Sequence, residues 1–244
     1  MCDRCGCGQV EHAHEHAHAH EHAHATRVVT VERALLERNA AVAAETRAWL
    51  RARRVLCLDL LGAPGAGKTA LLERTVPRLA GQVYAIEGDQ ATDHDAERLR
   101  RAGCPALQIN TGAGCHLEAP AVRAALEELD PRPGSVVFVE NVGNLVCPAL
   151  FDLGEQAKLV VTSVTEGEDK PLKYPHAFRA ARLVLVSKTD LLPHLECDLA
   201  LLRRNARAGG AEVLEVSART GAGLEAWCAW VEGARRATEV GAAG

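Results

Sequence analysis

The chain has 244 residues, a length typical of one domain with an appendage. Hydrophobic residues make up 48% and charged residues 25%, as in ordinary globular proteins. The formal net charge of −4 excludes a broadly basic nucleic-acid coat. No apolar run approaches the roughly 18 residues of a membrane span, and the N-terminus lacks the apolar core of a secretory signal. We therefore expect a cytoplasmic protein with no nucleic-acid partner and no membrane span.

The first 25 residues are rich in metal ligands and poor in large apolar side chains. They hold three of the nine cysteines and seven of the eleven histidines. A segment of this composition buries too little apolar surface to offset its chain entropy. We therefore expect residues 1–25 to form a disordered tail that binds metal.

Two ligand patterns lie in this tail. Three thiols fall within six residues, and thiolates suit Ni(II) or Zn(II); they are Cys2, Cys5 and Cys7. Alternating histidines then form a tract suited to weak uptake of several ions; they are His12, His14, His16, His18, His20, His22 and His24. The alternatives are free surface thiols for the first pattern and an expression tag for the second.

A helical pattern follows over 28–54, and it ends in a basic run that suits a helix C-terminus better than a nucleic-acid patch. We expect residues 26–54 to form a helix that packs on a domain at 55–238. That domain opens with an apolar strand at 55–61, a glycine-rich loop and a helix to about residue 79. The loop fits the phosphate-binding P-loop pattern in the required strand–loop–helix context; its residues are Gly62, Ala63, Pro64, Gly65, Ala66, Gly67, Lys68 and Thr69, with Ala70 next.

The rest of this domain alternates strands with helices. Strands are predicted at 82–87, 106–110, 135–140, 158–162, 183–186 and 213–216, and helices at 93–101, 118–129, 195–208 and 222–235. Such alternation predicts an α/β fold of the P-loop NTPase type, with a mostly parallel sheet covered by helices on both faces. Ligands in such a sheet bind beyond the carboxyl ends of the strands.

Two short motifs after later strands favour GTP over ATP. Ser187-Lys188-Thr189-Asp190 resembles the Asn-Lys-x-Asp motif of GTPases, with Ser in place of Asn. The Asp190 carboxylate can accept from guanine N1–H and the exocyclic amine, and the Lys188 stem can cover the base. Ser217-Ala218-Arg219 resembles the loop that touches guanine O6. In the P-loop, Lys68 is expected to reach the β- and γ-phosphates.

Acidic residues near the P-loop are candidates for holding Mg²⁺ with the Thr69 hydroxyl. Glu140 ends an apolar strand, where a Walker-B acid belongs. Asp95 lies in a segment that resembles a first switch, where Asp89 is another candidate, although Asp93 and Asp95 could instead cap a helix. A second constellation, Cys115-His116 and Cys147, could form a three-ligand metal site with an open position. The alternative for both cysteines is simple core packing.

Taken together, these motifs resemble those of a known family, the HypB nickel metallochaperones of the SIMIBI class of P-loop GTPases. The resemblance spans Cys2 to about Trp230. It rests on Cys2-x-x-Cys5-Gly6-Cys7, the histidine tract, Gly62 to Thr69, Glu87-Gly88-Asp89-Gln90, Thr111 to Leu117, and Glu140 to Pro148. It implies a slow GTPase that forms a GTP-dependent homodimer. It also implies delivery of Ni²⁺ for [NiFe]-hydrogenase maturation, with a nickel-insertion accessory protein and the hydrogenase large subunit as partners.

The resemblance further implies a high-affinity nickel site at Cys2, Cys5 and Cys7, and a nickel or zinc site at Cys115, His116 and Cys147 near the dimer interface. It favours Asp95 and Glu140 around Mg²⁺. Three other functions remain open: a urease nickel-delivery GTPase, a metal store with vestigial nucleotide binding, and an ordinary regulatory GTPase. The cysteine tail argues against the first, and the intact Lys68, Thr69 and Asp190 argue against the second.

Overall fold

The computed structural model describes residues 15–89, 93–112 and 114–240, with side chains from Ala34 to Glu239. The strands are β1 Leu56–Leu61, β2 Val83–Asp89, β3 Ala106–Asn110, β4 Val136–Glu140, β5 Ala157–Ser163, β6 Ala181–Ser187 and β7 Glu212–Glu215. The α-helices are α1 Glu15–Ala52, α2 Lys68–Thr75, α3 His94–Arg101, α4 Ala119–Leu129, α5 Lys170–Lys173, α6 Pro175–Ala180, α7 Leu199–Arg207 and α8 Leu224–Val240. Short 3-10 helices lie at Val76–Arg78, Val164–Glu166 and Thr189–His194.

The seven strands form one sheet in the order β3-β2-β4-β1-β5-β6-β7, and every strand pair is parallel. This arrangement confirms the predicted P-loop NTPase fold and all seven strands. The order reverses beside β1, so the carboxyl ends of β1, β2 and β4 border a crevice of the kind that holds ligands in open α/β sheets. The loops that leave these three strands line the phosphate cavity.

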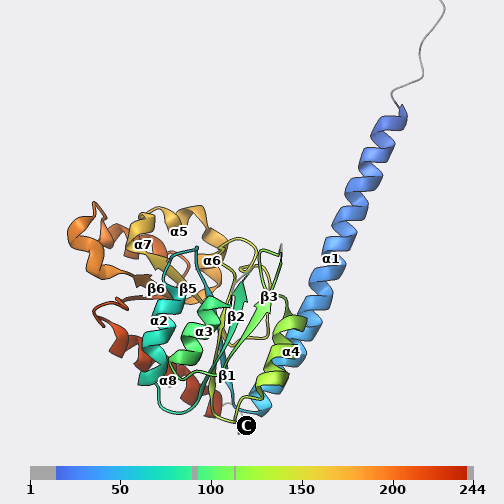
Figure 1. Ribbon diagram of the computed structural model, residues 1–244. Helices are drawn as coiled ribbons and strands as arrows, with labels where there is room; N and C mark the ends of the chain where they lie inside the picture. Colours follow the sequence, from blue (N-terminus) through green and yellow to red (C-terminus); the bar gives the residue numbers. More distant parts are fainter. Residues whose placement is uncertain (1–14, 90–92, 113, 241–244) are drawn as a thin grey trace, which may run out of the picture. The chain divides into compact units, whose positions relative to one another are not determined.

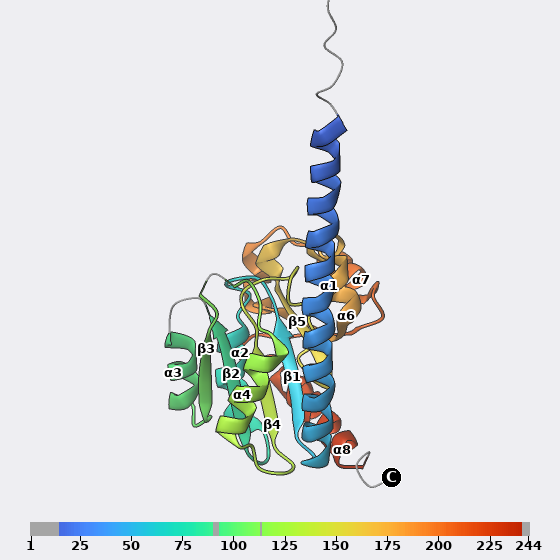
Figure 2. The same cartoon turned by 90° about the vertical axis from the view of Figure 1, so that its right-hand side faces the viewer.

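Helices cover both faces of the sheet (Figure 1, Figure 2). Even-numbered residues of β1 and β4 pack with α2, α3 and α8 in one buried cluster, which includes Leu58, Phe138 and Trp227. Their neighbours on the opposite face pack with α4 and the end of α1, as at Val137 and Leu50. Period-two alternation of buried side chains on both faces explains why these strands are continuously apolar.

The chain divides into residues 1–38 and residues 39–244. Helix α1 begins at Glu15, earlier than the expected start at residue 26, so residues 15–25 are helical where a disordered tail is predicted. Alanine and glutamate, which separate the histidines, are strong helix formers, and this explains the difference. Within residues 39–244, Thr46 and Leu50 of α1 are fully buried and lie one helical turn apart.

Other boundaries shift for local reasons. The helix predicted at 195–208 starts at Leu199, because the Asp198 side chain accepts a hydrogen bond from Leu201 N and caps it there. Asp93 occupies the N-cap of α3 without a capping hydrogen bond and pairs with Arg100 instead.

Among the described residues, no helix is long and apolar enough to cross a membrane.

Candidate functional site

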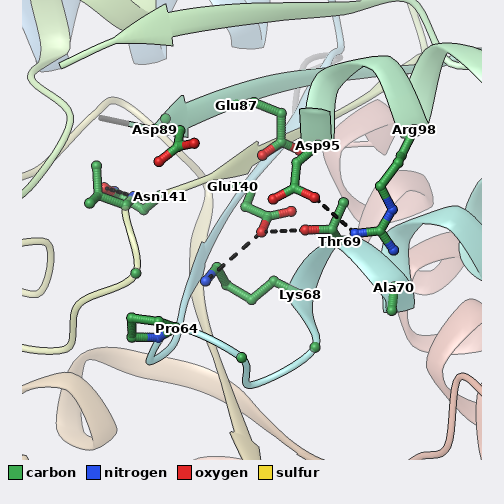
Figure 3. A pocket seen from close by; sticks show the side chains of 15 residues that line it. Pro64, Lys68, Thr69, Ala70, Glu87, Asp89, Asp95, Arg98, Glu140 and Asn141 are labelled. Carbon is green, nitrogen blue, oxygen red and sulfur yellow. Dashed lines mark hydrogen bonds and ion pairs between the residues drawn. The ribbon is translucent and has the colours of Figure 1, made fainter. Parts of the chain in front are cut away.

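A cavity of about 420 Å³ lies where β1, β2 and β4 end. The P-loop forms one wall, and residues after β2 and β4 form the others (Figure 3). Gly67 ends the loop with φ +94°, a left-handed conformation that favours glycine and places Lys68 at the start of α2. Backbone N–H groups at such a helix start form a phosphate-binding cradle.

Lys68, Thr69 and Glu140 meet inside this cavity. The Thr69 hydroxyl donates to Glu140 Oε1 at 2.9 Å, and Lys68 Nζ lies 3.9 Å from the same oxygen. Lys68 Nζ also lies 3.4 Å from the carbonyl oxygen of Gly62. All three side chains are buried, so the charges act in a medium of low dielectric constant where Coulomb forces are strong. The structure therefore brings two residues of the P-loop together with the acid that ends β4.

Glu87 joins this group and was not predicted as a site residue. It pairs in register with Glu140 across β2 and β4, and its side chain is 2% exposed. Figure 3 shows both carboxylates facing the cavity, and each has a buried oxygen without a hydrogen-bond partner, Glu87 Oε1 and Glu140 Oε2. Burial, reinforced by the nearby Glu140 carboxylate, raises the pKa of Glu87 well above its ordinary value. The sequence did carry a hint, because an acid interrupts an otherwise apolar strand.

Replacing Glu87 by Gln is expected to stabilise the nucleotide-free protein at neutral pH. A carboxyl whose pKa rises on folding holds its proton in the folded state and loses it in the unfolded state, so stability falls as pH rises above the unfolded value of about 4.3. Glutamine has no such titration. Thermal unfolding should show a midpoint about 2–4 °C higher at pH 7.5, with the difference vanishing below about pH 4. An equal shift at both pH values would contradict the assignment.

Asp95 also lines the cavity, from the first turn of α3. Arg98 holds it at 2.8 Å, and the same guanidinium binds Glu73 of α2 through two hydrogen bonds. Side-chain hydrogen bonds to Glu73 raise the pKa of Arg98 further. This bridge fixes α3 against the P-loop helix and aims the Asp95 carboxylate towards Glu140 (Figure 3).

A second cavity, of about 360 Å³, adjoins the first and shares Gly67 and Ala70 with it. The residues predicted to read guanine line it; they are Ser187, Lys188, Asp190, Ala218 and Arg219. Ser217 lies behind them, and its hydroxyl donates to Asp190 Oδ1 at 2.6 Å. One carboxylate oxygen is thereby fixed in place, which pre-orients the group expected to accept from the base.

Ser187 is the one departure from the GTPase motif, and it has a structural role here. Its hydroxyl donates to the carbonyl oxygen of Ala66 at 2.6 Å, in a buried position. This bond ties the end of β6 to the P-loop. Lys188, in a left-handed conformation, passes beside Gly67, where a Cβ atom would lie 3.8 Å from Lys188 Cε.

The structure also brings together Cys115, His116 and Cys147. One ligand atom from each lies within 4.8 Å of the other two, and all three residues are half-buried. Cys115 Sγ lies 3.5 Å from His116 Nδ1. A hydrogen bond with the Cys147 thiol raises the pKa of Cys115, and burial lowers the pKa of His116, which favours the neutral, ligating imidazole. Two sulfurs and one nitrogen suit Zn²⁺ or Ni²⁺ and leave a coordination position open.

The metal ligands predicted in the N-terminal tail cannot be placed. Cys2, Cys5, Cys7, His12 and His14 fall outside the described residues, and the side chains of the histidines from 16 to 24 are not described either. Among the other cysteines, Cys57 and Cys104 are buried and Cys197 and Cys228 are half-buried. None of these four belongs to a cluster of ligands in the described part of the chain.

Comparison with known proteins agrees with the fold. The model of the CobW/HypB/UreG nucleotide-binding domain matches residues 57–213, which places the chain among P-loop nucleotide-binding proteins of that class. The hydrogenase maturation factor HypB of Rhizobium leguminosarum bv. viciae is 53% identical over 220 residues, covering 86% of this chain and 73% of that protein.

Two solved structures are similar over most of the chain. HypB from Archaeoglobus fulgidus matches with a TM-score of 0.76 and 36% identity, over 82% of this chain and 100% of that one. HypB from Helicobacter pylori in complex with nickel matches with a TM-score of 0.76 and 32% identity, over 82% and 95%. The chain belongs to the HypB hydrogenase maturation factors of the CobW/HypB/UreG family.

Proposed function

We propose that this protein is a GTP-hydrolysing nickel metallochaperone that delivers Ni²⁺ for [NiFe]-hydrogenase maturation. One observation carries this proposal above the others: the loop that begins at Glu140, beside the P-loop, ends at Cys147, beside Cys115 and His116. A change at the γ-phosphate position therefore acts on the same eight-residue segment, from Glu140 to Cys147, that bears a metal ligand. The relative crystallised with nickel supports Ni²⁺ as the cargo.

Guanine nucleotide binding is proposed from the two adjoining cavities. The backbone of the P-loop, from Gly62 to Thr69, cradles the phosphates, and Lys68 pairs with the β- and γ-phosphate oxygens. Asp190 accepts from the base, and the Lys188 stem covers it. Hydrolysis is slow in the absence of a partner protein. Among the described residues, the arginine that lines the phosphate cavity is Arg98, and its guanidinium is already paired with Glu73 and Asp95.

The donor set at the phosphate cavity fits Mg²⁺. Thr69, Asp95 and Glu140 supply oxygen ligands, and the unpartnered oxygens of Glu87 and Glu140 are left for a cation or its water shell. Bound Mg²⁺ would neutralise the charge that develops on the transferred phosphoryl group. The chain itself orients Thr69 through Glu140, and holds Asp95 through Arg98.

The metal cargo is proposed to move between two places. Cys2, Cys5 and Cys7 capture nickel with high affinity, and the histidine tract holds a weaker reserve. Cys115, His116 and Cys147 hold Ni²⁺ or Zn²⁺ at an open site. GTP orders segments 87–97 and 140–148, so nucleotide state and metal affinity change reciprocally. A GTP-dependent homodimer passes the ion to a nickel-insertion accessory protein and the hydrogenase large subunit.

Replacing Asp190 by Asn is expected to convert the nucleotide preference from guanine to xanthine. The amide cannot accept from both guanine donors, and such a paired contact is worth roughly 1–3 kcal/mol, or about 5- to 150-fold in affinity. The new N–H instead matches the carbonyl group at C2 of xanthine. Equilibrium binding of GTP and xanthosine triphosphate tests this, with Asp198→Asn at the N-cap of α7 as a matched control. Unchanged GTP affinity would count against the base-reading role.

The proposal as a whole is tested by single-turnover GTP hydrolysis combined with nickel transfer. The purified chain, loaded with one Ni²⁺, should hydrolyse GTP to GDP and release nickel to a chelator faster during hydrolysis than with GDP. Hydrolysis without any change in nickel release would reduce the protein to an ordinary GTPase. Nickel binding without hydrolysis would make it a metal store.

A further inference from the structure

Two side-chain amides connect the loop after β4 to the segment that carries Cys115 and His116. Asn141 Oδ1 accepts from the backbone N–H of Leu117 at 3.1 Å. Asn144 Nδ2 donates to the carbonyl oxygen of Cys115 at 3.2 Å. His116 is thus bracketed, because one bond is made to the carbonyl group just before it and the other to the N–H group just after it.

The other ends of these amides are fixed to the nucleotide-binding region. Asn141 lines the phosphate cavity, is 2% exposed and donates to Asp59 Oδ1 of β1 at 3.1 Å (Figure 3). Asn144 pairs in an isolated β-bridge with Gly62, the first residue of the P-loop. Each asparagine therefore joins the segment that carries Cys115 and His116 to an element that borders the phosphate cavity.

A third contact reaches the same segment from β2. The side chain of Leu117 packs so closely on Gly88 that a Cβ atom there would lie 2.8 Å from Leu117 Cγ. Gly88 also lines the phosphate cavity. Leu117, the residue after His116, is therefore held between the ends of β2 and β4, the two strands whose loops are expected to respond to GTP.

A buried ion pair between Lys158 and Asp59 also links Asn141 to His116, through Phe151. Lys158 Nζ binds Asp59 Oδ2 at 2.8 Å and the carbonyl oxygen of Phe151 at 2.7 Å. The Phe151 ring lies 3.8 Å, centroid to centroid, from the His116 ring. The imidazole is thus packed against a residue tied to the same Asp59 that positions Asn141.

We propose that Asn141 and Asn144 are positioning residues that transmit the state of the nucleotide to Cys115 and His116. This inference rests on the proposed function, and it adds a second route beside the direct link through Cys147. If the loop after β4 moves, the hydrogen bonds from Asn141 and Asn144 must respond in one of two ways. They either break and leave polar groups unsatisfied, or they move the segment that carries Cys115 and His116 along with the loop. Cys147, in the loop after β4, and the Cys115-His116 pair then change position together, as a two-state element requires.

Asn144→Asp is the sharpest test, since it removes one bond and keeps its neighbour. The carboxylate can still accept from Val146 N, as Asn144 Oδ1 does at 2.8 Å, but it cannot donate to Cys115 O. Asn144→Ala removes the same donor without adding charge, and it also removes the acceptor for Val146 N. Asn205→Asp is the matched control, because its amide likewise donates to a backbone carbonyl, that of Glu168 at 2.8 Å, away from both sites.

The measurement is a Ni²⁺ titration of the full chain, followed by thiolate-to-nickel absorption, with GDP and with a non-hydrolysable GTP analogue. The parent carries Cys2→Ser, Cys5→Ser and Cys7→Ser, so that the tail thiols do not contribute. We expect its two affinities to differ by a factor in the range of about 5–150 that is typical of allosteric coupling. In both Asn144 variants this ratio should fall to within about twofold of one, with nucleotide affinity and melting temperature unchanged.

Each outcome decides something. A ratio that survives in both Asn144 variants overturns the inference and leaves the proposed function standing. A parent ratio of one overturns the proposed coupling, and this inference with it. A ratio lost equally in Asn205→Asp would show a general effect of loosened packing and would also overturn the inference. Asn141→Ala, which removes the bond to Leu117 N, should lose the ratio as well.

Discussion

Single-turnover GTP hydrolysis is expected to fall by about 100- to 1,000-fold when Lys68 is replaced by Ala. The ammonium group is buried in the phosphate cavity and lies 3.9 Å from Glu140, its nearest acidic partner. A positive charge held in place at the γ-phosphate needs no reorganisation in the transition state, so its loss acts mainly on the rate. Rapid-quench measurement of GDP formation under saturating enzyme gives this rate directly.

Lys170→Ala is the matched control for this experiment, because Lys170 pairs with Glu166 outside both cavities. It should hydrolyse GTP at the parent rate. Lys68→Ala also leaves Glu87 and Glu140 without their nearest cation, so melting curves must show that the variant is folded at the temperature used. A folded Lys68→Ala variant with the parent rate would contradict the assignment of this cavity to catalysis.

The second large effect is expected at the metal cluster. Cys147→Ala removes one of three ligands, and Ni²⁺ affinity at this site should fall by about 100-fold or more, since changes in residues that merely support ligands already cost about 10- to 100-fold. GTP affinity should stay intact, because Cys147 lines neither nucleotide cavity. The nucleotide dependence of nickel release should be lost with it.

Isothermal titration with Ni²⁺ and, separately, with a GTP analogue measures both quantities in one preparation. Cys228→Ala, a half-buried cysteine of α8 outside the cluster, serves as the control and should behave as the parent. Equal losses of nickel and GTP binding in Cys147→Ala would show that the loop after β4 is simply destabilised. In that case Cys147 would not be a ligand that couples the two sites.

The strands were predictable because they are buried on both faces, which leaves runs of apolar residues bounded by turns. The short helices α5 and α6 were not predicted. Each is at most six residues long and has a proline at its first or second position, so neither shows a helical period in the sequence. The start of α1 was misplaced because histidine-rich composition was weighed above the helix propensity of the intervening alanines.

The candidate site was predictable where one motif carries the chemistry, as in the P-loop and at Asp190. It was less so where the chemistry depends on pairs of strands. Glu87 matters because parallel register sets it beside Glu140, and Asp59 is tolerated in β1 because Lys158 of β5 neutralises it. Such pairings join residues far apart in the chain, and periodicity in one sequence does not reveal them. The same holds for Ser187, whose bond to the P-loop appears only in the folded chain.

The central claim, that nucleotide state controls metal affinity at Cys115, His116 and Cys147, is tested most directly by one titration. Ni²⁺ is added to the chain with residues 1–25 removed, once with GDP and once with a non-hydrolysable GTP analogue, while thiolate-to-nickel absorption is followed. We predict a stoichiometric site whose affinity differs between the two nucleotides. Absence of binding would contradict the claim and confine metal handling to the N-terminal tail. Binding of equal strength with both nucleotides would also contradict it, because the metal site would then be independent of the nucleotide.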